Sequence, residues 1–150
     1  MLNLKDIRKD VNFFKKKLGK IIWNKCGMSR NADDLKQAIE EIKILREDFY
    51  ANVLVPGSSD SFNEPLAKSI RVSDFLELGE LFAKDALERK ESCGGHFREE
   101  HQSKEGEALR DDENFTFVSA WEYKGNPSDA VLHKEQLNYE NIELKTRSYK

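Results

Sequence analysis

Apolar residues recur every three or four positions through the first half of the chain, and this spacing predicts helices that bury one face. A first stripe predicts a helix of about six turns over residues 4–21, capped by Asn3 and closed by Gly27. A second stripe predicts a helix over residues 31–55, with Asn31 as its N-cap. The members of the two stripes are Leu4, Ile7, Val11, Phe14, Leu18 and Ile21, then Leu35, Ala38, Ile42, Leu45 and Phe49. Because only a few residues join these helices, we expect them to lie antiparallel.

The third predicted helix covers residues 64–90 and has Pro65 in its first turn, where a missing N–H costs nothing. Its apolar residues form more than one narrow stripe: Leu66, Ile70, Val72, Phe75, Leu76, Leu78, Leu81, Phe82, Ala86 and Leu87. A helix that is apolar on two sides is expected to be buried on two sides. We therefore predict an all-α fold for residues 1–92, a three-helix antiparallel bundle like a spectrin repeat, whose third helix also contacts something outside the bundle.

The pattern changes in residues 93–150, where we predict a charged loop followed by a small β or extended appendage. Aromatic and β-branched residues over 115–123 predict a strand. A turn is predicted over 125–129, and the remainder to Lys150, which alternates weakly at Leu137, Tyr139, Ile142 and Leu144, is predicted to be extended. The strand carries more aromatic side chains than a lone edge strand needs, so we expect them to mark an interface.

Charge and composition exclude several functional classes. The chain has 25 basic and 28 acidic residues, so its net charge of −3 produces no global attraction to nucleic acid or to an anionic membrane. The basic run Lys15-Lys16-Lys17 lacks accompanying aromatic or glycine patterns and is interpreted as a solvated helix face. No stretch is apolar enough for a transmembrane helix or a signal peptide. Two cysteines, Cys26 and Cys93, form no disulfide framework and fit a reduced cytosolic setting.

Catalytic and metal-binding patterns are weak. The sequence contains no G-x-G-x-x-G, no phosphate-binding P-loop and no G-x-S-x-G. Cys93, His96 and His101 could donate to a metal, but the two histidines are five apart and a fourth ligand is not evident, so we predict no metal site. Cys93 as a nucleophile with His96 as its base lacks an orienting third group. We favour a loop whose arginine and histidine side chains make charge-assisted hydrogen bonds to a neighbouring surface.

Two charged segments carry a resemblance to a known family. They are Arg89-Lys90-Glu91-Ser92-Cys93-Gly94-Gly95-His96-Phe97-Arg98-Glu99 and Arg110-Asp111-Asp112-Glu113-Asn114-Phe115. Together they resemble the C-terminal domain of the succinate dehydrogenase/fumarate reductase flavoprotein subunit, whose pattern is close to R-x-E-S-R-G-x-H-x-R-x-D and then R-D-D-E-N. Cys93 replaces the second arginine of that pattern, and the ending Arg147-Ser148-Tyr149 resembles the R-x-Y terminus of the family.

The resemblance implies that the chain is one excised domain of a larger flavoprotein, comprising residues 1–92 and 93–150 together. It implies that FAD and the catalytic residues lie in domains ahead of this region, so that the chain contains no catalytic or cofactor-binding residue and is inactive alone. By analogy, the residues that dock on the flavin domain and support its site from outside are Arg89, Glu91, Ser92, Gly94, His96, Arg98, Arg110, Asp111 and Asp112.

The resemblance also implies partners and a location. The full subunit interconverts succinate and fumarate and passes electrons through the clusters of an iron–sulfur subunit to quinone, next to membrane anchor subunits. The complex would lie on the cytoplasmic face of the inner membrane. Two alternatives remain at this point: the C-terminal domain of an L-aspartate oxidase, which shares an E-S-R-G-x-H segment, and a stand-alone helical adaptor whose charged loop binds a protein.

Overall fold

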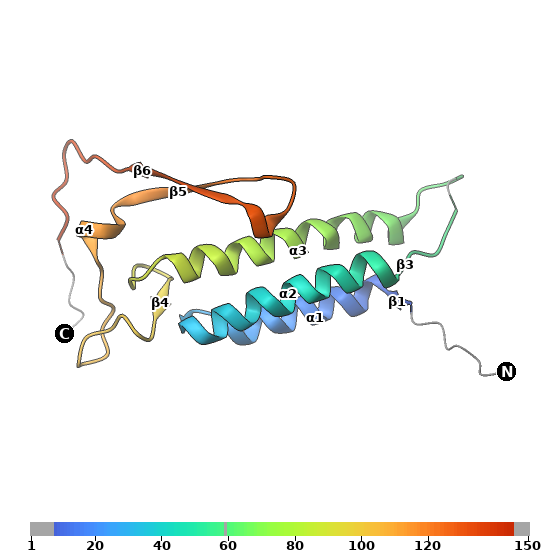
Figure 1. Ribbon diagram of the computed structural model, residues 1–150, viewed down its shortest axis with the longest axis horizontal. Helices are drawn as coiled ribbons and strands as arrows, with labels where there is room; N and C mark the ends of the chain where they lie inside the picture. The colour runs from blue at the N-terminus through green and yellow to red at the C-terminus, as the bar shows by residue number, and fades with distance from the viewer. Residues whose placement is uncertain (1–7, 59, 146–150) are drawn as a thin grey trace.

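Three long helices lie side by side in the computed structural model, which describes residues 8–58 and 60–145. They are α1 (Val11–Lys25), α2 (Ala32–Asn52) and α3 (Glu64–Glu88). Consecutive helices run in opposite directions, and α3 packs on both of the others (Figure 1). The predicted three-helix antiparallel arrangement is confirmed.

The first helix begins later than its apolar stripe predicts. The carboxylate of Asp10 accepts a hydrogen bond from the backbone N–H of Phe13 at 2.8 Å, and this N-cap starts α1 at Val11. The prediction of a helix from residue 4 is therefore wrong for residues 8–10, and its cap Asn3 lies outside the described residues. At the other end, α1 ends at Lys25 with Cys26 as its C-cap, and the predicted closing residue Gly27 follows directly.

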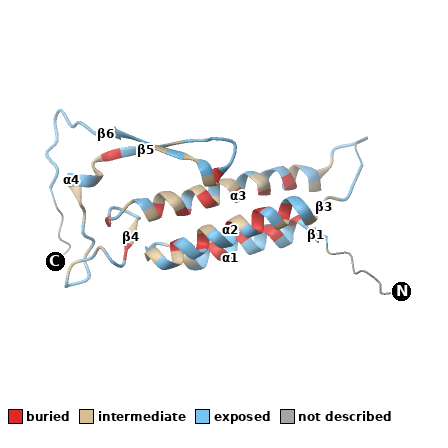
Figure 2. Ribbon diagram, viewed as in Figure 1, coloured by how far each residue is buried: buried red, intermediate tan, exposed pale blue. Residues whose placement is uncertain are grey.

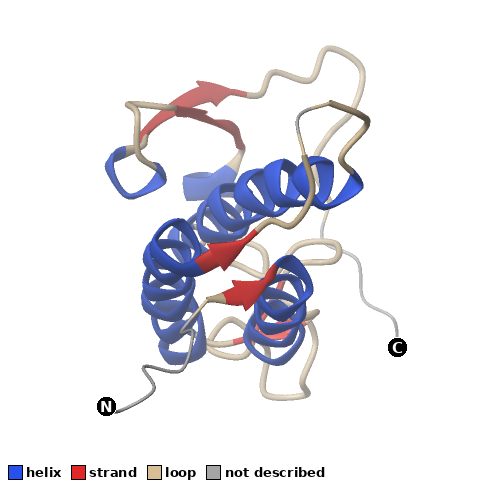
Figure 3. Cartoon of the chain, turned by 90° about the vertical axis from the view of Figure 1, so that its right-hand side faces the viewer, coloured by secondary structure: helices blue, strands red, loops and turns tan. Residues whose placement is uncertain are grey.

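A short parallel pairing replaces the expected last turn of the second helix. β3 (Val53–Leu54) follows α2 directly and pairs with β1 (Lys9–Asp10). Figure 3 looks along the bundle from this end and shows the two strands between helices. Because Val53 is extended, α2 ends at Asn52 instead of at residue 55.

The predicted starts of the other two helices are confirmed. The side chain of Asn31 accepts from the backbone N–H of Asp34 at 2.8 Å and caps α2. Asn63 caps α3 in the same way, accepting from Leu66 N–H at 3.0 Å, and Pro65 lies in the first turn. The third helix ends at Glu88, two residues before the predicted end.

The core lies where the stripes of the three helices face one another, as the buried positions in Figure 2 show. Phe14 of α1 and Phe49 of α2 meet edge to face with their ring centroids 5.2 Å apart. Both stripes predicted a buried face, and their described members are buried: Val11, Phe14, Leu18, Ile21, Leu35, Ala38, Ile42, Leu45 and Phe49. The third helix adds Val72, Leu76, Ala83 and Ala86.

The C-terminal part is an antiparallel hairpin that lies over α3 (Figure 1). It consists of β5 (Phe117–Glu122) and β6 (Val131–Gln136), joined through a short 3-10 helix, η1 (Pro127–Asp129). The predicted strand is confirmed in part, because Phe115 belongs to a short helix, α4 (Asp112–Phe115).

The fold is therefore mostly helical with small sheets, rather than all-α. In addition to β1–β3 and the hairpin, β2 (Ser29–Arg30) pairs in parallel with β4 (Phe97–Arg98). No helix within the described residues is long and apolar enough to cross a membrane.

Candidate functional site

The charged motif wraps the end of the bundle where α3 ends and α2 begins. β4 lies inside this motif, and its pairing with β2 attaches it to the connection between α1 and α2. Backbone N–H groups of Phe97 and Glu99 donate to the carbonyl oxygens of Met28 and Arg30 at 3.2 and 2.8 Å. Residues about 68 positions apart in sequence are thus held side by side.

Arg98 closes the end of α3. Its guanidinium is buried, and Nη1 donates to the carbonyl oxygens of Ala86 at 2.9 Å and Leu87 at 3.1 Å. The last carbonyls of a helix have no partners within the helix and carry a partial negative charge. The guanidinium donates to these carbonyls and brings positive charge to the helix end, so Arg98 acts as a side-chain cap on α3.

Ser92 holds the backbone of Arg98 in place. The hydroxyl of Ser92 accepts from the backbone N–H of Arg98 at 2.8 Å and lies 3.2 Å from its carbonyl oxygen. Ser92 is fully buried, and its own N–H donates to the carbonyl of Leu109 at 2.7 Å. A side chain larger than serine has no room here, and a side chain without the hydroxyl leaves a buried N–H unpaired.

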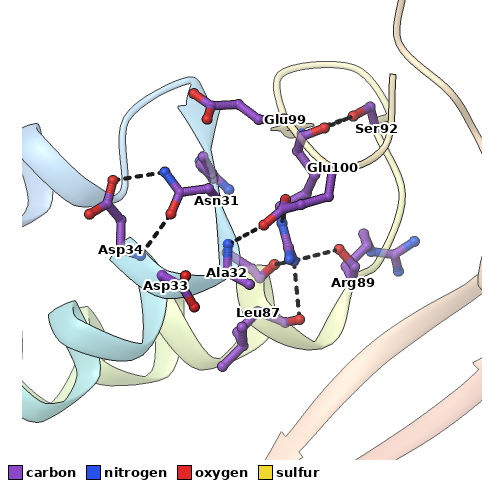
Figure 4. Close-up of polar contacts among 12 residues, drawn as sticks. Asn31, Ala32, Asp33, Asp34, Leu87, Arg89, Ser92, Glu99 and Glu100 are labelled. Atoms are coloured by element: carbon purple, nitrogen blue, oxygen red, sulfur yellow. Dashed lines mark hydrogen bonds and ion pairs between the residues drawn. The ribbon is translucent and has the colours of Figure 1, made fainter. Parts of the chain in front are cut away.

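Two acidic residues connect the motif to the start of α2. Glu100 accepts from the backbone N–H of Ala32, one of the free N–H groups of the first turn, and from Nε of Arg98 at 3.1 Å. Burial opposes ionisation of Glu100, but the hydrogen bonds from Ala32 and Arg98 outweigh it, so its pKa is lowered. Glu99 accepts from the hydroxyl of Ser29 at 2.8 Å. Figure 4 shows Glu100 next to Ala32.

His96 lies between two arginine residues with both ring nitrogens engaged. Nε2 lies 2.9 Å from the carbonyl oxygen of Arg89, and Nδ1 lies 2.9 Å from Nη1 of Arg30. A carbonyl only accepts and a guanidinium only donates, so Nε2 carries the proton and the ring is neutral. Burial lowers the pKa of His96, and the positive charge of Arg30 lowers it further.

Arg89 and Glu91 join the motif to the C-terminal segment. Nη1 and Nη2 of Arg89 donate to the carbonyls of Phe115 at 3.0 Å and Phe117 at 3.1 Å, and the guanidinium faces the Phe117 ring at 5.0 Å. Buried Glu91 accepts from Arg89 at 2.7 Å and from the N–H of Asp111 at 2.9 Å. The two predicted charged segments therefore bind each other.

The second segment forms the α4 turn. Asp111 is the N-cap of α4, because its carboxylate accepts from the N–H of Asn114 at 3.1 Å. Nε of Arg110 donates to Asp112 at 2.9 Å, and this ion pair is only partly buried.

Cys93, Gly94 and Gly95 are the exposed tip of the motif. The N–H of Cys93 and the carbonyl of His96 are paired at 2.9 Å across a tight turn. Gly94 has a φ of +59°, which an L side chain adopts only with strain. The described part of the chain contains no group of three His, Cys, Asp or Glu side chains placed to bind a metal ion.

The structure thus brings the predicted motif residues together, but the described contacts of Arg98, Ser92 and Glu91 lie within the chain rather than on an external surface. Two aromatic residues of β5 also make contacts within the chain. Phe117 is buried, and Nε1 of Trp121 donates to Asp85 on α3 at 2.8 Å.

Sequence reasoning missed a second polar cluster, between α2, α3 and the hairpin turn. Arg46 and Glu80 form a buried ion pair. Arg46 also donates to the side-chain oxygen of Asn126 at 3.0 Å, and Glu80 accepts from the hydroxyl of Ser128 at 2.6 Å. Nζ of Lys84 donates to the Pro127 carbonyl at 3.0 Å. These contacts fasten η1 to the bundle.

Fold and motif together define a helical bundle whose charged motif ties a C-terminal hairpin to the end of its third helix. The sequence model of the family described as fumarate reductase flavoprotein C-terminal domain matches residues 15–149, and the chain belongs to this family. The resemblance seen in the sequence is confirmed.

Individual relatives agree with this assignment. The fumarate reductase flavoprotein subunit of Proteus vulgaris is 32% identical over 127 residues, which are 85% of this chain and 19% of that protein. The corresponding subunit of Haemophilus influenzae is 29% identical over 98 residues, 65% of this chain and 15% of that protein. The chain therefore spans less than a fifth of the length of these two curated relatives.

Solved structures share the fold. A mutant of the E. coli quinol fumarate reductase FrdA aligns with a TM-score of 0.79 at 24% identity, over 95% of this chain and 23% of that chain. The Sdh1 complex of Mycobacterium smegmatis in the apo form aligns with a TM-score of 0.72 at 23% identity, over 93% and 23%. The structural matches are thus subunits of quinol fumarate reductase and Sdh complexes.

Proposed function

We propose that this chain is the accessory C-terminal domain of an FAD-dependent enzyme that interconverts succinate and fumarate. The whole subunit would exchange a hydride between dicarboxylate and FAD and pass electrons through iron–sulfur centres to quinone. The observation that carries the proposal is the family match over residues 15–149, which includes both charged segments.

FAD would be held by the part of the subunit outside this chain. The motif arginines do not fit a role as flavin ligands, because Arg89 and Arg98 use their guanidinium groups on carbonyl oxygens of their own chain. We propose no catalytic, cofactor-binding or metal-binding residue in the chain and expect it to be inactive alone. Its partners would be the flavin domain of the same subunit, the iron–sulfur subunit and, through the complex, the membrane anchor subunits at the cytoplasmic face of the inner membrane.

The predicted docking residues take a specific form in this proposal. Arg89, Glu91, Ser92, His96 and Arg98 build the loop, and the loop presents its exposed tip to the flavin domain. Gly94 allows the sharp turn, and the absence of side chains at Gly94 and Gly95 allows close approach. The α4 turn, with Arg110, Asp111 and Asp112, would flank the same contact.

Reading the coding sequence upstream of Met1 tests the proposal directly. We expect a preceding segment with a strand, a G-x-G-x-x-G turn and a helix, the pattern that binds a dinucleotide. A stop codon immediately upstream would support a stand-alone adaptor instead. In a second test, purified chain is incubated with FAD and passed through gel filtration. Retained flavin, or turnover of added succinate or fumarate, would refute the proposal.

Gly95→Trp tests the tip as a contact surface. A Cβ at Gly95 meets no atom within 4 Å, and its φ is not positive, so the isolated chain should melt as before. In the full subunit the indole should prevent close approach and lower the amount of bound flavin or of assembled complex. Lys104→Trp, in the neighbouring exposed loop, is the matched control. Unchanged flavin content with Gly95→Trp would contradict docking through the tip.

A further inference from the structure

A groove runs between α3 and the hairpin, away from the charged motif. It has a volume of about 410 Å³ and is lined by Asp74, Glu77, Leu78 and Leu81 of α3 and by Trp121, Tyr123, Pro127 and Ala130 of the hairpin and its turn. Leu78 is 60% exposed and Tyr123 57% exposed. Phe75 and Phe82 are also exposed on α3 and have the helical spacing of one face with Leu78, and the Arg30 guanidinium lies 4.9 Å from the Phe82 ring. The apolar surface around the groove is larger than single scattered residues explain.

The charged side chains that line the groove, Asp74 and Glu77, are both acidic. The cation Lys84 lies beside it, 5.6 Å from the Trp121 ring, and is held by the Pro127 carbonyl at 3.0 Å. Within residues 8–58 and 60–145, the carboxylate of Asp74 makes no side-chain hydrogen bond or ion pair, and Glu77 has only a long contact of 3.5 Å from the Tyr123 hydroxyl. Two adjacent carboxylates above an apolar floor complement a lysine or arginine, whose stem is apolar and whose head is cationic.

The hairpin that forms one wall has little support of its own. It is two-stranded, and such a hairpin is marginal in water unless another layer covers it. Trp121 and the η1 contacts fasten one face of it to α3, while Val118 and Val131 on the other face are exposed. A segment seated in the groove would contact the hairpin and the helix together and would stabilise their junction.

We propose that this groove receives a segment from the flavin-carrying portion of the same polypeptide, which inserts a basic side chain between Asp74 and Glu77. The inference rests on the proposed function. Its occupant follows from the length of chain that relatives carry outside this region, since the matched region is 15% to 19% of their length, and from the acidic mouth of the groove. The groove would then be a second contact surface of the domain. It lies on the side of α3 that faces away from the bundle, for which the apolar pattern of this helix predicts a partner.

Hydrogen exchange of the full subunit and of the isolated chain tests the inference. Backbone amides of β5 and β6 should exchange about tenfold more slowly in the full subunit, because opening of the hairpin then requires release of the seated segment. Leu78→Glu should remove most of this protection, whereas Leu66→Glu, also exposed on α3 (48% against 60% for Leu78) but outside the groove, should leave it unchanged. Melting of the isolated variant chains shows that both are folded.

The charge requirement is tested separately. Asp74→Lys with Glu77→Lys should remove the protection as Leu78→Glu does, and Asp74→Asn with Glu77→Gln should weaken it while preserving shape. Flavin content and fumarate reduction are measured on the same preparations. Normal flavin and activity with equal exchange in subunit and chain would overturn the groove assignment and leave the proposed function intact. A concentration-dependent dimer of the isolated chain that Leu78→Glu abolishes would assign the groove to a second copy and overturn the inference as well. A subunit that holds no flavin would overturn the proposed function.

Discussion

Nη1 of Arg98 donates a hydrogen bond of 2.9 Å to the carbonyl oxygen of Ala86, in the last turn of α3. The arginine is 3% exposed, so this contact is shielded from water and from salt. It joins a residue of the family motif to the bundle itself. The motif therefore holds the domain together, and any contact it makes with another domain depends on that internal role.

Arg98→Ala should destabilise the isolated chain by about 2–4 kcal/mol, because buried carbonyls of α3 lose charged donors and Glu100 loses a partner. The measurement is urea unfolding followed by circular dichroism. Arg98→Lys should recover part of the loss, since an ammonium group can reach fewer of these acceptors. Arg71→Ala, on the exposed side of α3, is the control and should change stability by less than about 0.5 kcal/mol. Equal stability of the two alanine variants would show that Arg98 is not a cap.

The adjacent glycines of the motif should respond differently to the same substitution. Gly94→Ala places a side chain at a φ of +59° and should cost about 1–2 kcal/mol. Gly95→Ala meets no atom within 4 Å and has no positive φ, so it should be neutral or slightly stabilising, because alanine restricts the unfolded chain. Thermal unfolding of the pair at one pH measures the difference. A loss of the same size at both positions would mean that space rather than backbone conformation limits this turn.

Lowering the pH should decrease the free energy of unfolding of the chain, because of the shifted pKa of His96. Burial and the charge of Arg30 lower the pKa of His96 in the folded state, so the unfolded chain binds the proton more readily. The contribution of neutral His96 to the free energy of unfolding is complete above about pH 6.5, which is the pKa of an ordinary histidine. This contribution is lost as the pH falls from there towards the lower pKa of the folded state.

The measurement is the free energy of unfolding in urea at several pH values between about 8 and 5.5, above the range where most carboxyl groups titrate. His96→Gln should flatten the slope. His133→Gln, at an exposed position of β6, is the matched control and should keep it. A wild-type slope that is unchanged by His96→Gln would assign the pH dependence to other groups.

The helices could be predicted from the sequence because their stripes face one core and local caps set their starts, as at Asn31 and Asn63. The later start of α1 could not be predicted, because the capping carboxylate of Asp10 lies within an uninterrupted stripe of apolar residues. The motif residues were found by resemblance, but their partners were not. Pairing of β2 with β4 joins segments about 68 residues apart, and no local pattern specifies such a contact.

The sequence carries a signal for the buried pair of Arg46 and Glu80. Glu80 occupies the apolar stripe of α3, four residues after Leu76 and three before Ala83. An acidic residue at such a position needs a partner when the helix packs. Its cationic partner on α2 and the hydroxyl of Ser128 supply this.

Removing either member of this pair should be costly, since each leaves a buried charge behind. Arg46→Ala or Glu80→Ala should destabilise the chain by about 3–5 kcal/mol, whereas the double variant Arg46→Met with Glu80→Leu should lose much less than the sum of the two single changes. Arg46→Ala should also speed hydrogen exchange at η1, because Asn126 loses its donor. The exposed pair Glu64 and Lys68 is the control, and its double alanine variant should change stability by less than about 1 kcal/mol. Strictly additive losses at Arg46 and Glu80, with unchanged exchange at η1, would show that the two side chains act independently and that the hairpin turn does not depend on Arg46.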